Sequence, residues 1–145
     1  MMKIDFWQLS RDPVEKVTAL IAQRVLDQGE RLLVVSANPD QRTALSRGLW
    51  QADPESFLAN SEAGKDGAER QPILLSGCCE PANGASHAIF ADGTYRETEG
   101  FARAFLLFDD SSLQHARETW KALSDRDGLE RAFFRQDGGK WVKVA

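Results

Sequence analysis

The segment of residues 112–124 carries two basic side chains and an indole at helical spacing. At about 100° per residue, Arg117 and Lys121 lie one turn apart on a helix, with Trp120 on their flank. Leu113 falls between Trp120 and Arg117 in projection. An Arg side chain holds a carboxylate with two hydrogen bonds, and an indole offers contact to an apolar group. The pattern predicts a surface for a peptide with negative charge next to an apolar side chain; the alternative is a solvated basic stripe with Trp120 half-buried.

A second group, formed by Trp50, Phe57 and Leu58, lies between the second expected helix and a long polar segment. Aromatic side chains exposed as a group mark surfaces that contact other proteins. The group therefore predicts a contact for a partner helix. The alternative is that these side chains belong to the core or anchor the loop.

Two pairs of reactive side chains leave a small α/β enzyme or a thiol-redox protein open as rival functions. Asp109 and Asp110 follow an apolar strand, at the end where α/β proteins often bind ligands, although helix capping also explains them. Cys78 and Cys79 are adjacent, so a disulfide between them would close a small ring and could not link distant segments. We expect both thiols to be reduced.

Motifs for cofactors and metals are missing from the sequence. It contains no GxGxxG, no GxxxxGK[ST] and no GxSxG, so it lacks the phosphate loops and the nucleophile elbow of α/β enzymes. The turn at residues 10–13 has no glycine through which backbone could approach a pyrophosphate. His87 and His115 fall in different elements, and the cysteine pair matches no zinc spacing. We therefore expect no cofactor, no metal and no catalysis.

Length and composition fit one globular domain over residues 1–145. Hydrophobic residues make up 42% and charged residues 28% of the chain, which is typical of a folded protein. The 18 Lys and Arg against 22 Asp and Glu give a net charge of −4, which argues against broad binding to DNA. No apolar run approaches the ~20 residues that span a membrane, and residues 1–9 are unlike a secretory signal. We expect a cytoplasmic protein that neither enters membranes nor binds DNA directly.

The hydrophobic pattern predicts strands that alternate with helices. Strands are expected at residues 4–9, 31–36, 71–76, 86–91, 101–108, 129–135 and 140–144. Residues 57–70 are predicted to form a surface loop, and Pro72 suggests an edge position or the first position of its strand. The order of elements predicts a three-layer α/β fold, with a mainly parallel sheet, helices on both faces and a C-terminal antiparallel hairpin.

Three helices carry start and stop signals. The first is expected from Pro13, with Asp12 as N-cap and Glu15 completing a capping box, and Gly29 ends it. The second begins at Asn38-Pro39 and ends near Trp50. The third follows Asp109 and runs to about residue 125.

Several of these segments resemble one family, the chi subunit of bacterial DNA polymerase III. The resemblance extends over nearly the whole chain and depends on the order and spacing of the segments. They are Ile4-Asp5-Phe6 with Leu9, Leu49-Trp50 with Ser56-Phe57-Leu58, Gln71-Pro72-Ile73-Leu74-Leu75, Asn83-Gly84-Ala85, Ala116-Arg117-Glu118 with Trp120-Lys121, and Phe134-Arg135-Gln136-Asp137 with Gly139-Lys140-Trp141. The chain departs from the family at Ala59-Asn60-Ser61, where many members have Pro-His-Gly, and at Trp120, where Tyr also occurs.

The resemblance implies a Rossmann-like α/β fold without a nucleotide site and a non-enzymatic adaptor of the replisome. Family members bind the acidic C-terminal tail of single-stranded DNA-binding protein, which ends in Pro-Phe, and link it to the clamp loader. The tail contacts of the family fall here on Arg117, Trp120 and Lys121. A separate surface for the psi subunit, or for a helicase-like partner, falls on Trp50 and Phe57.

Overall fold

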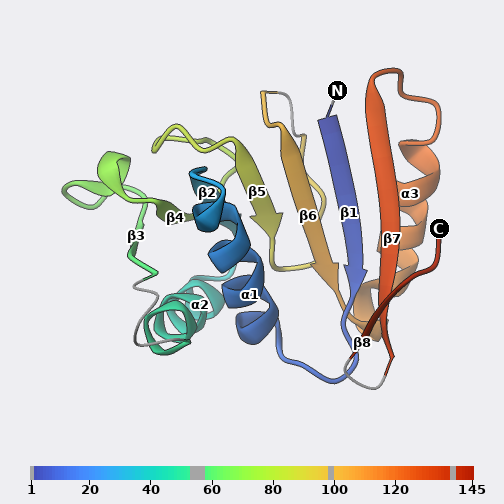
Figure 1. Cartoon of the computed structure of the whole chain (residues 1–145), viewed down its shortest axis with the longest axis horizontal. Helices are drawn as coiled ribbons and strands as arrows, with labels where there is room; N and C mark the ends of the chain where they lie inside the picture. The colour runs from blue at the N-terminus through green and yellow to red at the C-terminus, as the bar shows by residue number, and fades with distance from the viewer. Residues whose placement is uncertain (1, 53–57, 98–99, 138–139) are drawn as a thin grey trace.

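The computed structural model describes residues 2–52, 58–97, 100–137 and 140–145 (Figure 1). In chain order its strands and helices are β1 (Met2–Gln8), α1 (Val14–Asp27), β2 (Leu32–Val35), α2 (Pro39–Gln51), β3 (Asn60–Glu62), β4 (Ile73–Ser76), β5 (His87–Phe90), β6 (Arg103–Phe108), α3 (Leu113–Ala122), β7 (Leu129–Asp137) and β8 (Lys140–Lys143). Among the described residues, one eight-stranded sheet has the order β3-β4-β2-β5-β6-β1-β7-β8. Every neighbouring pair is parallel except β7 and β8. The predicted parallel sheet and its C-terminal antiparallel hairpin are confirmed.

Different helices cover the two faces of the sheet, which gives the predicted three layers (Figure 1). On one face, α1 and α2 pack against strand residues such as Val34 and Ile89. On the other face, α3 packs against residues such as Phe6 and Leu106. All residues of β2, β4 and β5 are buried, because helices or loops remove both faces of these strands from water. The continuous apolar runs of the sequence correspond to these strands.

The ends of α1 confirm one prediction and contradict another. Gly29, with φ of +77°, follows the helix, and its N–H donates to the Leu26 carbonyl at 2.9 Å. The predicted capping box at the start is wrong, because Pro13 is the N-cap and no side chain caps it. The Asp12 carboxylate accepts instead from Gln136 Nε2 at 2.9 Å and from Lys16 Nζ at 3.3 Å.

The start of α2 is capped as predicted. The Asn38 side chain accepts from the N–H groups of Asp40 at 2.9 Å and Gln41 at 3.4 Å, and Pro39 is the first helical residue. The helix ends at Gln51, one residue beyond the expected Trp50. The Asn cap followed by proline therefore predicted the start of this helix correctly, because tertiary contacts do not alter it.

The segment after α2 holds more structure than a surface loop. Its short strand β3 pairs in parallel with β4 and forms one edge of the sheet. Asn60 is buried in β3; its Oδ1 accepts from Ser46 Oγ at 2.6 Å and its Nδ2 donates to the Leu58 carbonyl at 2.9 Å. The edge position expected for the strand after Pro72 is wrong, since β3 covers that edge, whereas Pro72 does directly precede the strand.

Gln136 joins the end of β7 to the loop that follows β1. It is 4% exposed, and its Oε1 accepts from the backbone N–H groups of Ser10 at 3.3 Å, Arg11 at 2.9 Å and Asp12 at 3.1 Å. One side chain thus satisfies three consecutive backbone donors. This arrangement also turns the Asp12 carboxylate toward Gln136 and away from the helix start.

Replacing Gln136 with Leu should lower the free energy of unfolding by about 2 kcal/mol, because three partly buried backbone donors lose their shared acceptor. Gln28→Leu changes the same side chain at an exposed position and should stay within about 0.5 kcal/mol of the wild type. Urea unfolding followed by circular dichroism measures both. Equal stability of the two variants would contradict the assigned role of Gln136.

Candidate functional site

The helix α3 presents the predicted basic flank to solvent. A short 3-10 turn (Asp110–Ser112) leads from β6 into the helix, and Asp109 caps this turn with its carboxylate. Within α3, Ala116 is buried, whereas Arg117 and Lys121 are exposed. The helix ends at Ala122, about one turn earlier than expected. The amphipathic helix with its two neighbouring cations is confirmed.

Trp120 is half-buried and forms the wall between this flank and the sheet. Its ring meets Phe6 edge to face at 5.2 Å and Phe133 at 5.6 Å between centroids. The Arg131 guanidinium carbon lies 4.0 Å from the indole centroid, over the ring, and Arg131 Nη1 donates to the Trp120 carbonyl. The indole is therefore held firmly at the surface, with one part of it left in contact with water.

The cations around Trp120 lack internal acidic partners. Among the described residues, neither Arg117 nor Lys121 forms an ion pair, and Arg131 bonds only to the Trp120 carbonyl. Other arginines are neutralised by carboxylates of the chain, namely Arg42, Arg96, Arg103 and Arg126. A local excess of positive charge on a chain of net charge −4 favours an anionic partner at this place.

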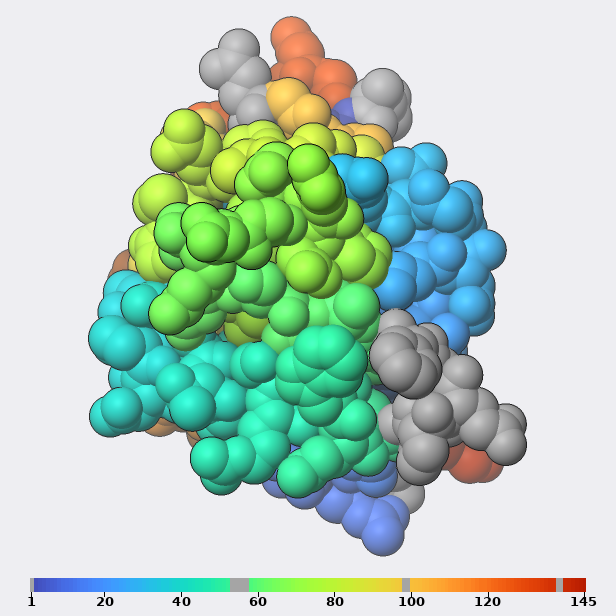
Figure 2. All heavy atoms as spheres, turned by 90° about the vertical axis from the view of Figure 1, so that its left-hand side faces the viewer, coloured from blue at the N-terminus to red at the C-terminus, as the bar shows by residue number. Residues whose placement is uncertain are grey.

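The predicted partner surface at Trp50 lies at the other end of the molecule. Trp50, on α2, is 50% exposed, and α2 runs beside β3 at the sheet edge opposite to β7 and β8 (Figures 1 and 2). Phe57 lies outside the described residues. Leu58 is 2% exposed and packs in the core, so the prediction of an exposed contact is wrong for this residue and the alternative, a core position, is confirmed. Of the described members, Trp50 is the exposed one.

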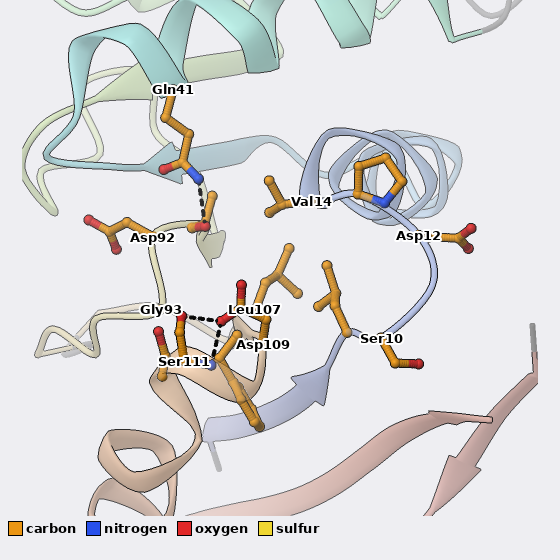
Figure 3. A pocket seen from close by; sticks show the side chains of 14 residues that line it. Ser10, Asp12, Val14, Gln41, Asp92, Gly93, Leu107, Asp109 and Ser111 are labelled. Carbon is orange, nitrogen blue, oxygen red and sulfur yellow. Dashed lines mark hydrogen bonds between the residues drawn. The ribbon is translucent and has the colours of Figure 1, made fainter. Parts of the chain in front are cut away.

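A cavity of about 360 Å³ lies beyond the carboxyl ends of β1, β5 and β6 (Figure 3). This is the edge where α/β proteins often bind nucleotides. The described lining includes Asp12, Asp92 and Asp109 but no Lys, Arg or His. Figure 3 shows the carboxylates of Asp12 and Asp92 pointing away from the centre of the cavity. A phosphate would find three acids around it and no cation, so the cavity does not suit a nucleotide.

The acids of this edge have structural partners. Arg96 binds Asp92 at 2.7 Å, and the Ala37 N–H donates to Asp92 at 3.0 Å. Burial alone would raise the pKa of Asp92, but these hydrogen bonds outweigh it and the pKa is lowered. The Ser111 hydroxyl and N–H likewise lower the pKa of Asp109. Both carboxyl groups are therefore ionised at neutral pH and are poor candidates for a general acid.

The remaining reactive side chains are not assembled into a catalytic group. Asp110 accepts from Gln8 Nε2 at 3.2 Å, so it points to a different partner from Asp109. Cys78 and Cys79 are free thiols, and burial raises the pKa of Cys79, which lowers its reactivity. The hydrogen bonds of Asp109 and Asp110 favour a structural role for that pair.

The two histidines lie apart, and among the described residues neither belongs to a group that could bind a metal ion. His87 starts β5 and contacts Ser86 Oγ through Nδ1 at 2.8 Å, whereas His115 is exposed on α3. Within the described ranges, no three His, Cys, Asp or Glu side chains lie close enough to hold a metal ion. In the same residues, no helix has the length and apolar character needed to cross a membrane.

Comparison with known families decides the assignment. A sequence model described as DNA polymerase III chi subunit, HolC, matches residues 1–129. The chain belongs to this family. The chi family is a non-catalytic part of the DNA polymerase III holoenzyme and of its clamp-loader complex, so the chain is a replisome subunit. No curated protein matches the chain.

The family match includes all of α3 and ends at the first residue of β7. The C-terminal segments that resemble chi subunits therefore lie beyond the matched range. So does Arg131, a neighbour of Trp120 that the sequence analysis did not single out. Strand periodicity alone puts Arg131 on the same face as Phe133, but only the pairing of β7 with β1 brings that face to Trp120.

Asp92→Asn should destabilise the protein in a pH-dependent way. Because the folded pKa of Asp92 is lowered, its carboxylate contributes stability above its unfolded pKa of about 3.9, and this is lost as the pH falls through the folded value. The difference in unfolding free energy between wild type and variant should be largest above about pH 5 and shrink toward about pH 3. Denaturant titrations at a series of pH values measure it. A constant difference over this range would refute the charge-based role.

Proposed function

We propose that this chi-family chain is a non-catalytic adaptor whose α3 flank binds the acidic C-terminal tail of single-stranded DNA-binding protein and thereby links it to the clamp loader. The observation that carries the proposal is a pair of exposed cations, Arg117 and Lys121, next to a half-buried indole; neither forms an ion pair with a described residue. A peptide that ends in Pro-Phe with a free carboxylate offers the complementary groups. The family assignment supports the same partner class.

In this proposal the basic and the apolar side chains of the site bind different parts of the peptide. Opposite charge steers the acidic tail toward Arg117 and Lys121, and one of them takes the terminal carboxylate. Trp120 and the half-buried Leu113 form the apolar wall for the terminal Phe side chain. Since a short disordered peptide must become ordered on binding, we expect micromolar affinity, about −8 kcal/mol.

The adaptor acts through protein contacts rather than through DNA. A net charge of −4 disfavours binding along an extended phosphate backbone. The Trp50 surface is proposed for the psi subunit or a helicase-like protein. We propose that residues 1–145 work as one cytoplasmic domain without a cofactor, consistent with the acid-lined cavity at the sheet edge.

Arg117→Ala should weaken binding of a synthetic acidic peptide ending in Pro-Phe by about 1–3 kcal/mol, because a charge-assisted bond is lost. Added salt should weaken the wild-type complex as well. Isothermal titration calorimetry measures both effects. Arg70→Ala removes an exposed arginine near β4 at the far end of the sheet and serves as the matched control. The role of Arg117 would be disproved by wild-type affinity in its variant.

Trp50→Ala should leave peptide binding unchanged and weaken capture of the clamp-loader or helicase partner by tenfold or more, roughly 1.4 kcal/mol. The expectation rests on the distance between α2 and α3 across the sheet. Calorimetry with the tail peptide and surface plasmon resonance with purified psi subunit give the two affinities. Loss of peptide binding with intact partner binding would reverse the assignment of the surfaces.

A further inference from the structure

Arg131 reaches the tail site from the sheet rather than from the helix. It is the third residue of β7 and lies opposite Ile4 of β1. Because side chains alternate along a strand, Arg131 and Phe133 both point to the face that α3 covers. Arg131 therefore approaches Trp120 from a different element than Arg117 and Lys121 do.

Two contacts fix the guanidinium of Arg131 in place. Its carbon lies 4.0 Å from the centroid of the Trp120 ring, and one of its N–H groups donates to the Trp120 carbonyl. A guanidinium has five N–H donors, and the contact with the Trp120 carbonyl uses one nitrogen, so N–H groups remain that can bind a carboxylate. The two contacts therefore hold the group beside Trp120 without neutralising its charge.

The charge of Arg131 is not neutralised inside the protein. Among the described residues, Arg131 has no carboxylate partner, although its side chain is half-buried. Arg103, on the opposite face of the sheet, shows the contrasting case, because it is paired with the buried Asp5. A partly desolvated cation without an internal acid favours an external one.

We propose that Arg131 is a third cation of the tail site and binds an acidic side chain of the peptide just before its terminal Pro-Phe. This inference rests on the proposed function and adds to it the residue that recognises the acidic side chains of the peptide. Arg117 and Lys121 hold the carboxyl end on one side of the indole, and Arg131 holds charge over the indole face. An extended peptide advances about 3.3 Å per residue, so an acid two or three positions before the Phe lies about 7–10 Å from it along the peptide.

The competing explanation is a structural role, in which Arg131 only holds Trp120 in position. Replacing Arg131 weakens peptide binding in either case. Only if Arg131 contacts the peptide directly does the loss of affinity depend on the charge of the peptide. The test uses two synthetic peptides that both end in Pro-Phe, one with an Asp run before it and one with each Asp replaced by Asn. The variants are Arg131→Gln, Arg131→Met, which keeps apolar contact with the indole, and Arg131→Lys, which keeps the charge.

Arg131→Gln and Arg131→Met should each weaken the Asp peptide about tenfold and the Asn peptide less than about twofold. Arg131→Lys should restore most of the preference for the Asp peptide, and Arg70→Gln should change neither affinity. Thermal unfolding checks that the variants fold. Should Arg131→Gln fail to fold, Arg131→Met decides the question.

The outcomes distinguish a failure of the role of Arg131 from a failure of the proposed function. Equal losses for both peptides, or no loss, would overturn the direct role of Arg131 while leaving the tail site in place. A wild-type protein that binds neither peptide would overturn the proposed function, and the inference with it.

Discussion

Burial of the parallel sheet on both faces is the constraint on which the rest of the structure depends. Strands such as β2 and β5 have no water-facing side, so their residues are committed to the core. Function is then confined to the outer flanks of helices, the strand ends and the sheet edges. Trp120 lies where α3 meets the last parallel strand, so its indole can complete the core with Phe6 and Phe133 and still reach solvent.

The strand ends, which serve most α/β enzymes, are used differently in this chain. Pro13 stands at the start of α1, and proline has no N–H to offer an anion. Asp92 and Asp109 occupy the same edge and are held ionised by their own hydrogen bonds. Gly93, with φ of +76°, leaves room there for the Ser112 side chain. The edge therefore stabilises loops, and the binding role that we propose lies on α3.

Local signals in the sequence predicted most of the fold, whereas long-range contacts decided where prediction failed. Apolar runs located the buried strands, and the Asn38-Pro39 cap located a helix start. The Asp12 cap failed because Gln136, 124 residues away, captures the neighbouring N–H groups and the carboxylate. Helical spacing likewise placed Arg117 and Lys121 correctly on an exposed flank. It could not place Arg131, whose approach to Trp120 depends on the pairing of β7 with β1.

The separation of the two candidate surfaces fits the proposed adaptor role, in which one small chain connects two partners. Trp120 contacts β1 and β7, whereas Trp50 lies on α2, which contacts β3 and β4. At about 4.8 Å per strand, the five steps from β4 to β7 span roughly 24 Å. A short peptide on α3 and a partner on α2 therefore do not compete for space. Between the two surfaces, the described residues of β2 and β5 are buried throughout, so a packed sheet separates the two places. If both proposed partners bind, their linkage would follow from simultaneous binding, with an effective concentration set by the sheet between them.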